Sequence, residues 1–257
     1  MLFLISPAKS LDYDTPLGDV PHTLPLFTRQ SVELIDVLRR KTPAQVSALM
    51  DISDPLAALN VARYEAFSPR FTERNSRQAA LAFDGDVYDG LQARTLKPAQ
   101  LQWAQEHLCI LSGLYGVLRP LDRMQPYRLE MGTSLETARG RNLYQFWGDR
   151  IATYLNERQA EEKSPVVVNL ASQEYFKSVD RKVLRARVVE CVFEEYKSGQ
   201  YKVISFPAKR ARGMMARYAI VNRIGSVKKL EGFDADGYAF APDVSTPDRL
   251  VFRRRAG

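Results

Sequence analysis

The sequence has 257 residues, of which 45% are hydrophobic and 26% are charged, and its formal net charge is +7. This composition excludes a chain that is too poor in apolar residues to fold, and no run approaches the roughly 18 apolar residues of a membrane-spanning helix. The positive balance favours an anionic partner, such as nucleic acid, an anionic membrane face or a phosphorylated small molecule; a solvated basic surface is the alternative.

The chain begins with an apolar run, Leu2–Ile5, which is closed by Ser6-Pro7 and predicts a buried strand. Because the run is short and no basic segment precedes it, it does not have the pattern of a targeting segment. The only cysteines lie far apart in the sequence, which is typical of free thiols in a reducing compartment. We therefore expect a cytoplasmic protein.

Apolar spacing, capping residues and turn residues define the remaining elements, after a long loop over 10–26. No repeat or linker interrupts them, so we expect one mixed α/β (α+β) domain over 1–257, with a mixed sheet flanked by helices. A hairpin is expected around Ser198-Gly199. In chain order the elements are helices over 31–41, 43–50 and 54–66, a strand over 79–83, helices over 87–93 and 98–107, a strand over 108–111, a helix over 142–157, strands over 165–171, 185–193 and 201–206, a helix over 208–223 and a strand over 250–254.

The strongest charge feature is the basic window 196–230, which contains no Asp or Glu. Helix surfaces usually mix charges of both signs, because opposite charges three or four residues apart stabilise a helix. An unbalanced run indicates an anionic partner. The alternative is that acids elsewhere, such as Asp84, Asp86 or Glu130, pair with it. Within the window, Lys209 and Arg212 are one helical turn apart and are the best candidates for a shared anion.

A glycine turn lies in the stretch LSGLYGVLRPLDRMQPYRLEMG (111–132), where Gly113 and Gly116 are three residues apart. Such a turn can bring backbone N–H groups close to a phosphate, as in helix-hairpin-helix modules and in the glycine loop of KH domains. Two glycines are weak support for this function. A simple turn between a strand and a helix explains them equally well. Further along, Arg128 and Glu130 alternate and are expected to face the same side of a strand, either paired with each other or around a ligand.

Polar residues follow two of the predicted strands. Ser6 and Lys9 come after the first strand, and a second group comes at the end of strand 165–171. Residues just past the carboxyl ends of strands commonly build sites in α/β folds, so a polar or phosphate pocket is expected here. The alternative is that Ser172 merely caps a surface helix. The residues of the second group are Asn169, Ser172, Glu174, Tyr175 and Lys177.

The sequence predicts neither a metal nor a cofactor. The soft metal ligands are few, and they form no C-x-x-C or H-x-x-x-H spacing. No Walker A or Gly-x-Gly-x-x-Gly motif is present. The histidines and cysteines are His22, His107, Cys109 and Cys191.

Six stretches, spread over nearly the whole chain, have a distinctive pattern: LISPAK (4–9), FDGDVYDGL (83–91), the stretch 111–132 quoted above, LYQFWGD (143–149), NLASQEYFKSV (169–179) and SFPAKRARGMMARY (205–218). Together they resemble the YaaA family of bacterial peroxide stress resistance proteins. One departure is Pro207, where an aromatic residue is usual in the family. The resemblance implies a cytosolic protein that limits damage from unincorporated iron. It also implies a single α/β domain with a positively charged cleft and a helix-hairpin-helix-like element, which binds double-stranded and distorted DNA.

Matching the motifs to this chain gives a set of expected DNA contacts. The glycine hairpin is matched to Gly113–Gly116. The residues matched to the charge of the cleft are Lys9, Arg119, Arg128, Lys209, Arg210 and Arg212. No obligate protein partner and no membrane are expected. The expected DNA contacts are Gly113, Leu114, Tyr115, Gly116, Arg119, Lys209, Arg210, Arg212 and Arg217.

The sequence leaves two functions open. The first is a DNA-binding protein of the hydrogen-peroxide stress response. The alternative is an enzyme acting on a small anionic substrate, phosphorylated or carboxylated, because backbone binding does not require a carboxylate such as Glu130 among cations. The expected pocket of that enzyme consists of Lys9, Arg128, Glu130, Asn169, Ser172, Glu174 and Lys177.

Overall fold

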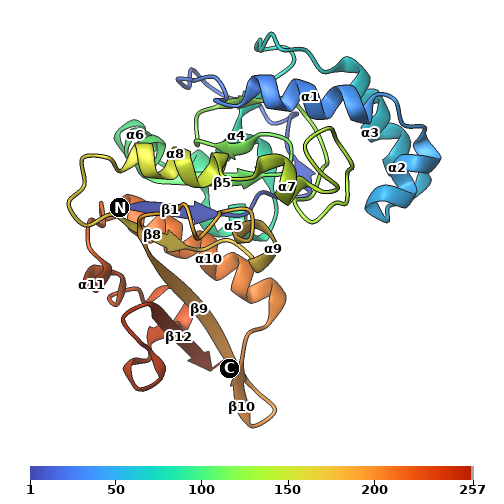
Figure 1. Cartoon of the computed structure of the whole chain (residues 1–257). Helices are drawn as coiled ribbons and strands as arrows, with labels where there is room; N and C mark the ends of the chain where they lie inside the picture. Colours follow the sequence, from blue (N-terminus) through green and yellow to red (C-terminus); the bar gives the residue numbers. More distant parts are fainter. Residues whose placement is uncertain (256–257) are drawn as a thin grey trace.

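The structure is a computed structural model that describes residues 1–255 (Figure 1). Its strands are β1 (Leu2–Ile5), β2 (Ser10–Leu11), β3 (Arg77–Gln78), β4 (Phe83–Asp84), β5 (Leu108–Ser112), β6 (Gly116–Leu118), β7 (Arg123–Met124), β8 (Val166–Asn169), β9 (Arg187–Lys197), β10 (Gln200–Lys202), β11 (Ala239–Phe240) and β12 (Arg249–Arg255). Its helices are α1 (Thr28–Leu38), α2 (Pro43–Met50), α3 (Asp54–Ala66), α4 (Ala79–Ala82), α5 (Asp86–Leu91), α6 (Pro98–His107), α7 (Leu143–Trp147), α8 (Arg150–Arg158), α9 (Gln173–Phe176), α10 (Ser205–Val221) and α11 (Val227–Leu230).

A mixed sheet of eight strands forms the centre of the domain, in the order β11-β12-β9-β8-β1-β5-β6, with β10 paired to β9. The strands from β12 to β5 are parallel to their neighbours, whereas β6, β10 and β11 are antiparallel additions. The central strands β1 and β5 are buried along their whole length. This is expected of parallel strands that are covered on both faces.

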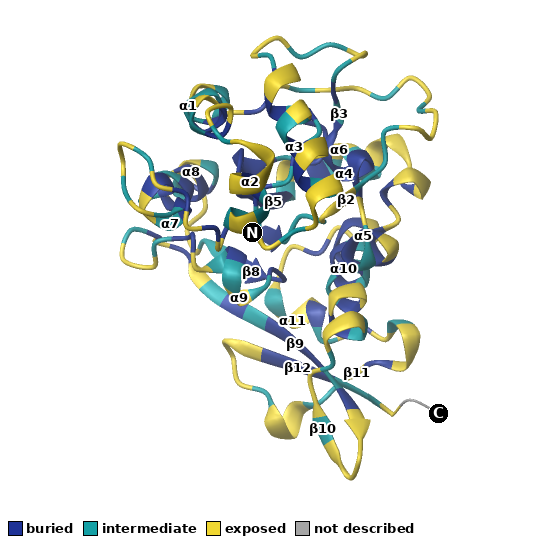
Figure 2. Ribbon diagram, turned by 90° about the vertical axis from the view of Figure 1, so that its right-hand side faces the viewer, coloured by how far each residue is buried: buried dark blue, intermediate teal, exposed yellow. Residues whose placement is uncertain are grey.

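Helices cover both faces of this sheet. In Figure 2, α7 and α8 lie on one side of the central strands, and α5 and α10 lie on the other. Helix α10 packs against β1 and β9. Beyond β8, the strands β9, β10 and β12 extend away from the body of the domain, and their tip is exposed (Figures 1 and 2). In the part of the chain that the structure describes, no helix is long and apolar enough to cross a membrane.

Helices α5 and α10 approach so closely that their contact has no room for side chains. A Cβ atom added to Gly213 would lie 1.8 Å from the carbonyl oxygen of Val87. In the same way, a Cβ atom on Gly90 would lie 2.1 Å from the carbonyl oxygen of Arg210. This contact sets the position of the first half of α10 relative to the loop before α5.

Most of the expected elements are present, including the mixed α/β class and the hairpin at Ser198-Gly199. Both residues of that turn have positive φ, 54° and 84°, which suits a two-residue hairpin. The strand expected over 79–83 is wrong, because Ala79–Ala82 forms a short helix that is buried on all sides. A continuous apolar run fits a buried helix as well as a buried strand.

Further boundaries differ from the predictions: α1 spans Thr28–Leu38 instead of 31–41, and β9 spans Arg187–Lys197 instead of 185–193. The single helix expected over 142–157 is divided into α7 and α8 by Gly148, which has a φ of 52°. The strand expected over 201–206 ends at Lys202, and α10 already begins at Ser205. The helix therefore starts one turn earlier than predicted, with Pro207 in its first turn, where a missing N–H costs no helical hydrogen bond.

We predict that Gly213→Ala destabilises the protein by about 1–3 kcal/mol, because the added methyl group forces α5 and α10 apart. Urea unfolding followed by circular dichroism measures this change. Gly18→Ala is the control: a Cβ atom there meets nothing within 4 Å, so its effect should stay within about 0.5 kcal/mol. Equal stability of the two variants would contradict the close contact.

Candidate functional site

A polar cavity of about 370 Å³ lies at the carboxyl ends of β1 and β8. In the sheet, β1 lies between β5 and β8. The chain first forms β5 on one side of β1 and later forms β8 on the other side, so the direction in which strands are added reverses at β1. Ligand sites of α/β folds are commonly found at such a reversal. The strand-end cavity is lined by Ser6, Pro7, Ala8, Lys9, Ser10, Asp84, Gly85, Asp86, Val87, Glu130, Ser172, Glu174, Tyr175, Lys209 and Arg212.

Two of the serines that line the cavity, Ser6 and Ser172, are hydrogen-bonded to each other. The backbone N–H of Ser172 donates to Ser6 Oγ at 2.8 Å. Ser172 Oγ in turn caps α9 by accepting from the N–H of Tyr175, so the predicted helix cap is confirmed. The same hydroxyl therefore both caps a helix and lines the cavity.

Glu130 is held by two cations. Its Oε2 lies 3.0 Å from Lys9 Nζ, and its Oε1 accepts from Arg128 Nη2 at 2.9 Å. The expected pairing of Arg128 with Glu130 is present, although this segment is irregular backbone rather than a strand. Glu130 lines the cavity, and Arg128 does not. Arg128 contacts the cavity only through its hydrogen bond to Glu130.

The remaining residues of the expected pocket fall into two groups. Glu174 lines the cavity, and its Oε1 accepts from the N–H of Gly132 at 2.9 Å. Asn169 instead holds the turn after β8, where its Oδ1 accepts from the N–H of Ala171. Lys177 lies outside the cavity, with its Nζ 4.9 Å from the centre of the Tyr144 ring.

One wall of the cavity comes from α10 and the segment around α5. Lys209 Nζ is 3.9 Å from Asp86 Oδ2, a long ion pair. Arg212 lines the cavity and makes no hydrogen bond or ion pair within residues 1–255. Burial lowers the pKa of Arg212, and the nearby Glu190 only partly opposes this effect. The guanidinium group is thus a partly buried cation that has no protein acceptor within residues 1–255.

The turn Gly113–Gly116 joins the antiparallel strands β5 and β6 and is buried. The expected helix-hairpin-helix is therefore not formed here. A Cβ atom on Gly113 would lie 2.2 Å from the carbonyl oxygen of Leu129, and one on Gly116 would lie 2.7 Å from the Trp147 ring. These glycines are required by close packing. Leu114 and Tyr115 are completely buried, so a DNA backbone does not reach this turn in the described conformation.

Helices α2 and α3 pack on each other. Residues 51–53 connect them; Asp51 ends α2 with a φ of 51°, and the N–H of Ile52 donates to the carbonyl oxygen of Ser47. The sequence predicted both helices, with Thr42 as a cap. The turn between them carries no glycine, so the sequence offered no signal for a hairpin.

Several of the expected DNA-contacting arginines are engaged in the fold. Arg119 pairs with the buried Asp122 at 2.8 Å. Arg210 pairs with Asp236 at 3.1 Å. Arg217 donates to the carbonyl oxygens of Leu91 and Gln92, both at 3.1 Å. Arg119 and Arg217 therefore serve the fold, whereas Arg210 remains half-exposed.

The cavity also contains residues that the sequence did not place in a site. Asp84 and Asp86 were expected only as possible partners of the basic window, and here they form part of the cavity wall. Their stretch, FDGDVYDGL, is one of those that carry the family resemblance. That stretch was the only signal that could have indicated their position.

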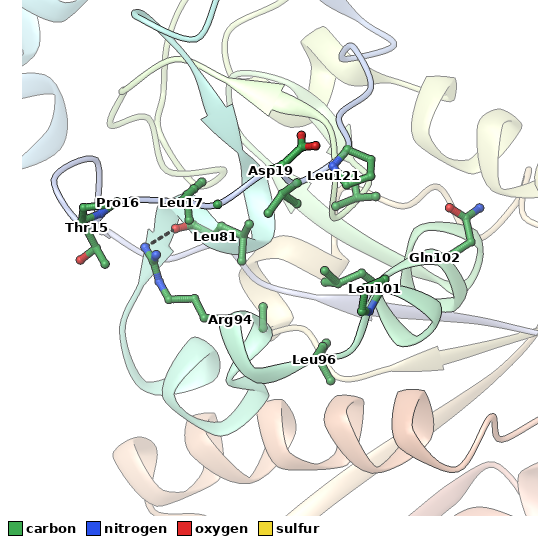
Figure 3. A pocket seen from close by; sticks show the side chains of 15 residues that line it. Thr15, Pro16, Leu17, Asp19, Leu81, Arg94, Leu96, Leu101, Gln102 and Leu121 are labelled. Carbon is green, nitrogen blue, oxygen red and sulfur yellow. Dashed lines mark hydrogen bonds between the residues drawn. The ribbon is translucent and has the colours of Figure 1, made fainter.

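A second cavity, of about 350 Å³, is mostly aliphatic (Figure 3). Leu81, Leu96 and Leu101 contribute to its lining, and the loop around Leu17 closes it. Arg94, its cation, already donates to the carbonyl oxygen of Leu81 and to Asp12. Asp19 is the acid of this lining. A third cavity, of about 520 Å³, is polar and is lined by Asp19, His22, Glu73, Arg77 and Arg123 among others.

Neither a metal cluster nor an exposed thiol is found within residues 1–255. No three or more His, Cys, Asp or Glu side chains in this range are placed to hold a metal ion. Cys109 and Cys191 are free and buried. Burial raises the pKa of Cys109 to about 12 and also raises the pKa of Cys191.

The fold and the cavity define an α/β protein with a polar site of mixed charge at the carboxyl edge of its parallel strands. The chain belongs to the peroxide stress protein YaaA family, whose model matches residues 1–244. It is 69% identical over 255 residues to a UPF0246 protein of Polaromonas sp. (strain JS666 / ATCC BAA-500), with 99% of each chain covered. It is 70% identical over 258 residues to a UPF0246 protein of Delftia acidovorans (strain DSM 14801 / SPH-1), again with 99% of each chain covered. Family membership assigns the chain a role in peroxide stress.

We predict that neither thiol reacts with iodoacetamide or hydrogen peroxide in the native protein near neutral pH. A raised pKa keeps each thiol protonated, and the thiolate is the reactive form. Mass spectrometry of the native and the urea-unfolded protein checks this, since both cysteines should be modified only after unfolding. Rapid modification of either cysteine in the folded protein would contradict the burial described.

Proposed function

We propose that this peroxide stress protein binds the DNA backbone in the cytoplasm without reading the base sequence. The observation that carries the proposal is the acid-free window 196–230, which forms the tip of the β9–β10 hairpin, α10 and α11. The proposed contact is the basic surface, defined as Lys197, Lys202, Lys209 and Arg210, all exposed. Phosphate binding by such side chains is driven largely by counterion release.

The geometry of the hairpin supports this proposal. Lys197 pairs with Gln200 across the hairpin, and Lys202 follows Gln200 by two residues. Cross-strand partners and alternate residues share one face of a sheet, so both lysines project from the same face. Neither lysine has an ion pair within residues 1–255. Both are therefore available to phosphate groups, unlike Arg119 and Arg217.

The position of the hairpin also favours a macromolecular partner. The tip of β9 and β10 lies away from the body of the domain, with solvent around it (Figure 1). A rigid duplex needs an accessible convex or open surface, because it cannot enter a cavity of about 370 Å³. Helix α10 begins three residues after β10 ends, so the hairpin and the first turns of α10 are linked closely in the chain.

We predict that the double variant Lys197→Glu/Lys202→Glu binds all duplex sequences more weakly. The slope of log affinity against log salt should fall by about 2, one for each lost phosphate contact. Fluorescence anisotropy with labelled duplexes of unrelated sequence, over a salt series, measures both quantities. An unchanged affinity or slope would sink the assignment of the basic surface.

The matched control is Lys163→Glu/Lys182→Glu, which changes the net charge equally on exposed turns outside the basic window. This variant should keep the wild-type salt slope. An equal loss of affinity in both double variants would mean that only total charge matters, and the proposed surface would be wrong.

The proposal extends to iron-driven oxidative damage. A bound protein shields the backbone, so ferrous iron and hydrogen peroxide should nick a supercoiled plasmid more slowly in the presence of the wild-type protein. Lys197→Glu/Lys202→Glu should give little protection, and Lys163→Glu/Lys182→Glu should protect like the wild type. Gel electrophoresis measures the nicked fraction. Equal protection by all three proteins would show that protection does not require DNA binding by the basic surface, and would contradict this extension of the proposal.

A further inference from the structure

We propose that the strand-end cavity binds a small ligand that carries a phosphate or carboxylate group together with an amine, and that Arg212 is the main anchor of the anionic group. This inference does not depend on DNA binding. It rests on one unpartnered cation, on the charges that surround it and on the convergence of distant segments upon one cavity.

Arg212 differs from the other arginines of α10. Arg210 is paired with Asp236, and Arg217 donates to backbone carbonyls. Arg212 lines the cavity without a hydrogen bond or an ion pair in the part of the chain described. Removing a guanidinium group from water without a partner costs free energy. An anion bound in the cavity would offset this cost, and the planar guanidinium suits the paired oxygens of phosphate and carboxylate groups.

Other donors of the cavity are available to the same anionic group. Lys9 forms an ion pair with Glu130, and Lys209 forms a longer one with Asp86. Because an ammonium group has three N–H donors, each lysine keeps donors for a ligand. Ser6 Oγ already accepts from Ser172 N–H, and its own hydrogen points to Ser172 Oγ only at 3.4 Å. Each of these groups can therefore donate to a ligand without breaking the contacts described.

The carboxylates of the cavity set the second requirement on the ligand. Glu130 is neutralised by Lys9 and Arg128. Asp84 has no ion pair among the described residues, and Glu174 accepts only from a backbone N–H. A ligand with several negative charges and no donor would be repelled by Asp84 and Glu174. A ligand amine satisfies both, so the cavity selects a small molecule with an anionic end and an amine.

These side chains come from segments that are remote in sequence. The loop after β1, the segment of β4 and α5, the loop containing Glu130, the start of α9 and the first half of α10 each supply a polar group. The volume, about 370 Å³, lies within the range of small-molecule sites. A solvated surface would not require such convergence, which supports a binding site.

The test compares ligands by thermal unfolding at constant ionic strength. Inorganic phosphate and O-phosphoethanolamine form one pair, and acetate and β-alanine form the other. O-phosphoethanolamine should raise the melting temperature more than phosphate, or β-alanine should raise it more than acetate. The pair that shows this difference tells whether the cavity prefers a phosphate or a carboxylate group. If none of the four stabilises the wild-type protein, or if the simple anions act as strongly as the amines, the proposal is overturned.

Arg212→Met tests the anchor. The variant should lose the ligand-dependent rise. Without ligand its melting temperature should equal or exceed that of the wild type, because a partly buried cation without a protein partner is replaced by an apolar chain of similar length. A lower melting temperature without ligand would mark Arg212 as structural and overturn its role. Lys197→Met, which removes a charge from the exposed hairpin, should keep the full ligand response.

Lys9→Met gives a second measure with little risk to folding, since its side chain is 63% exposed. We expect calorimetry to show affinity for the responding ligand weakened about tenfold, the effect of one charge-assisted hydrogen bond. Unchanged affinity would contradict binding of the ligand in the strand-end cavity. Arg212→Met should leave duplex affinity unchanged, so the DNA proposal and the cavity proposal can fail separately.

Discussion

The hydrogen bonding of β1 to β8 on one side and to β5 on the other determines where the polar groups of this molecule meet. Leu4 is aligned with Asn169 in β8 and with Cys109 in β5. Since the strands are parallel, β1 ends within one residue of the level at which β8 ends, and the segments that follow these two strands emerge side by side. Ser6 and Ser172 thereby come within one hydrogen bond of each other. A shift of one residue in this register would turn the side chains of β1 to the opposite face.

Close packing of α5 on α10 then closes the site from the other side. Because Gly90 and Gly213 leave room for backbone contact only, the first half of α10 is held against the loop that carries Asp84 and Asp86. Cations and carboxylates are in this way brought together in one cavity, where their charges largely compensate. The exceptions among the described residues are Asp84, Glu174 and Arg212, which have no ion-pair partner. The ligand proposed above would supply the missing partners.

The strands were predictable because Leu2–Ile5, Leu108–Ser112 and Val166–Asn169 are apolar runs bounded by polar residues, and the position of Ser172 followed from its capping chemistry. The role of Gly113–Gly116 was not predictable. A glycine that admits a phosphate and a glycine that admits the Trp147 ring leave the same sequence pattern. The cavity was only half predictable, since Asp86 and Arg212 are more than a hundred residues apart and no local pattern shows which residues face each other.

The basic window is one feature of the sequence but three environments in the structure. A helix turns about 100° per residue, so Lys209 and Arg212 lie on the face toward the cavity, while Arg210 lies on the face toward Asp236. Lys197 and Lys202, on the hairpin before the helix, share none of these acids. Composition alone therefore overstates the size of any single anion site. The exposed lysines suit a polymer that is held by many weak, screened contacts, whereas a single partly buried arginine without a protein partner suits one well-placed anionic group.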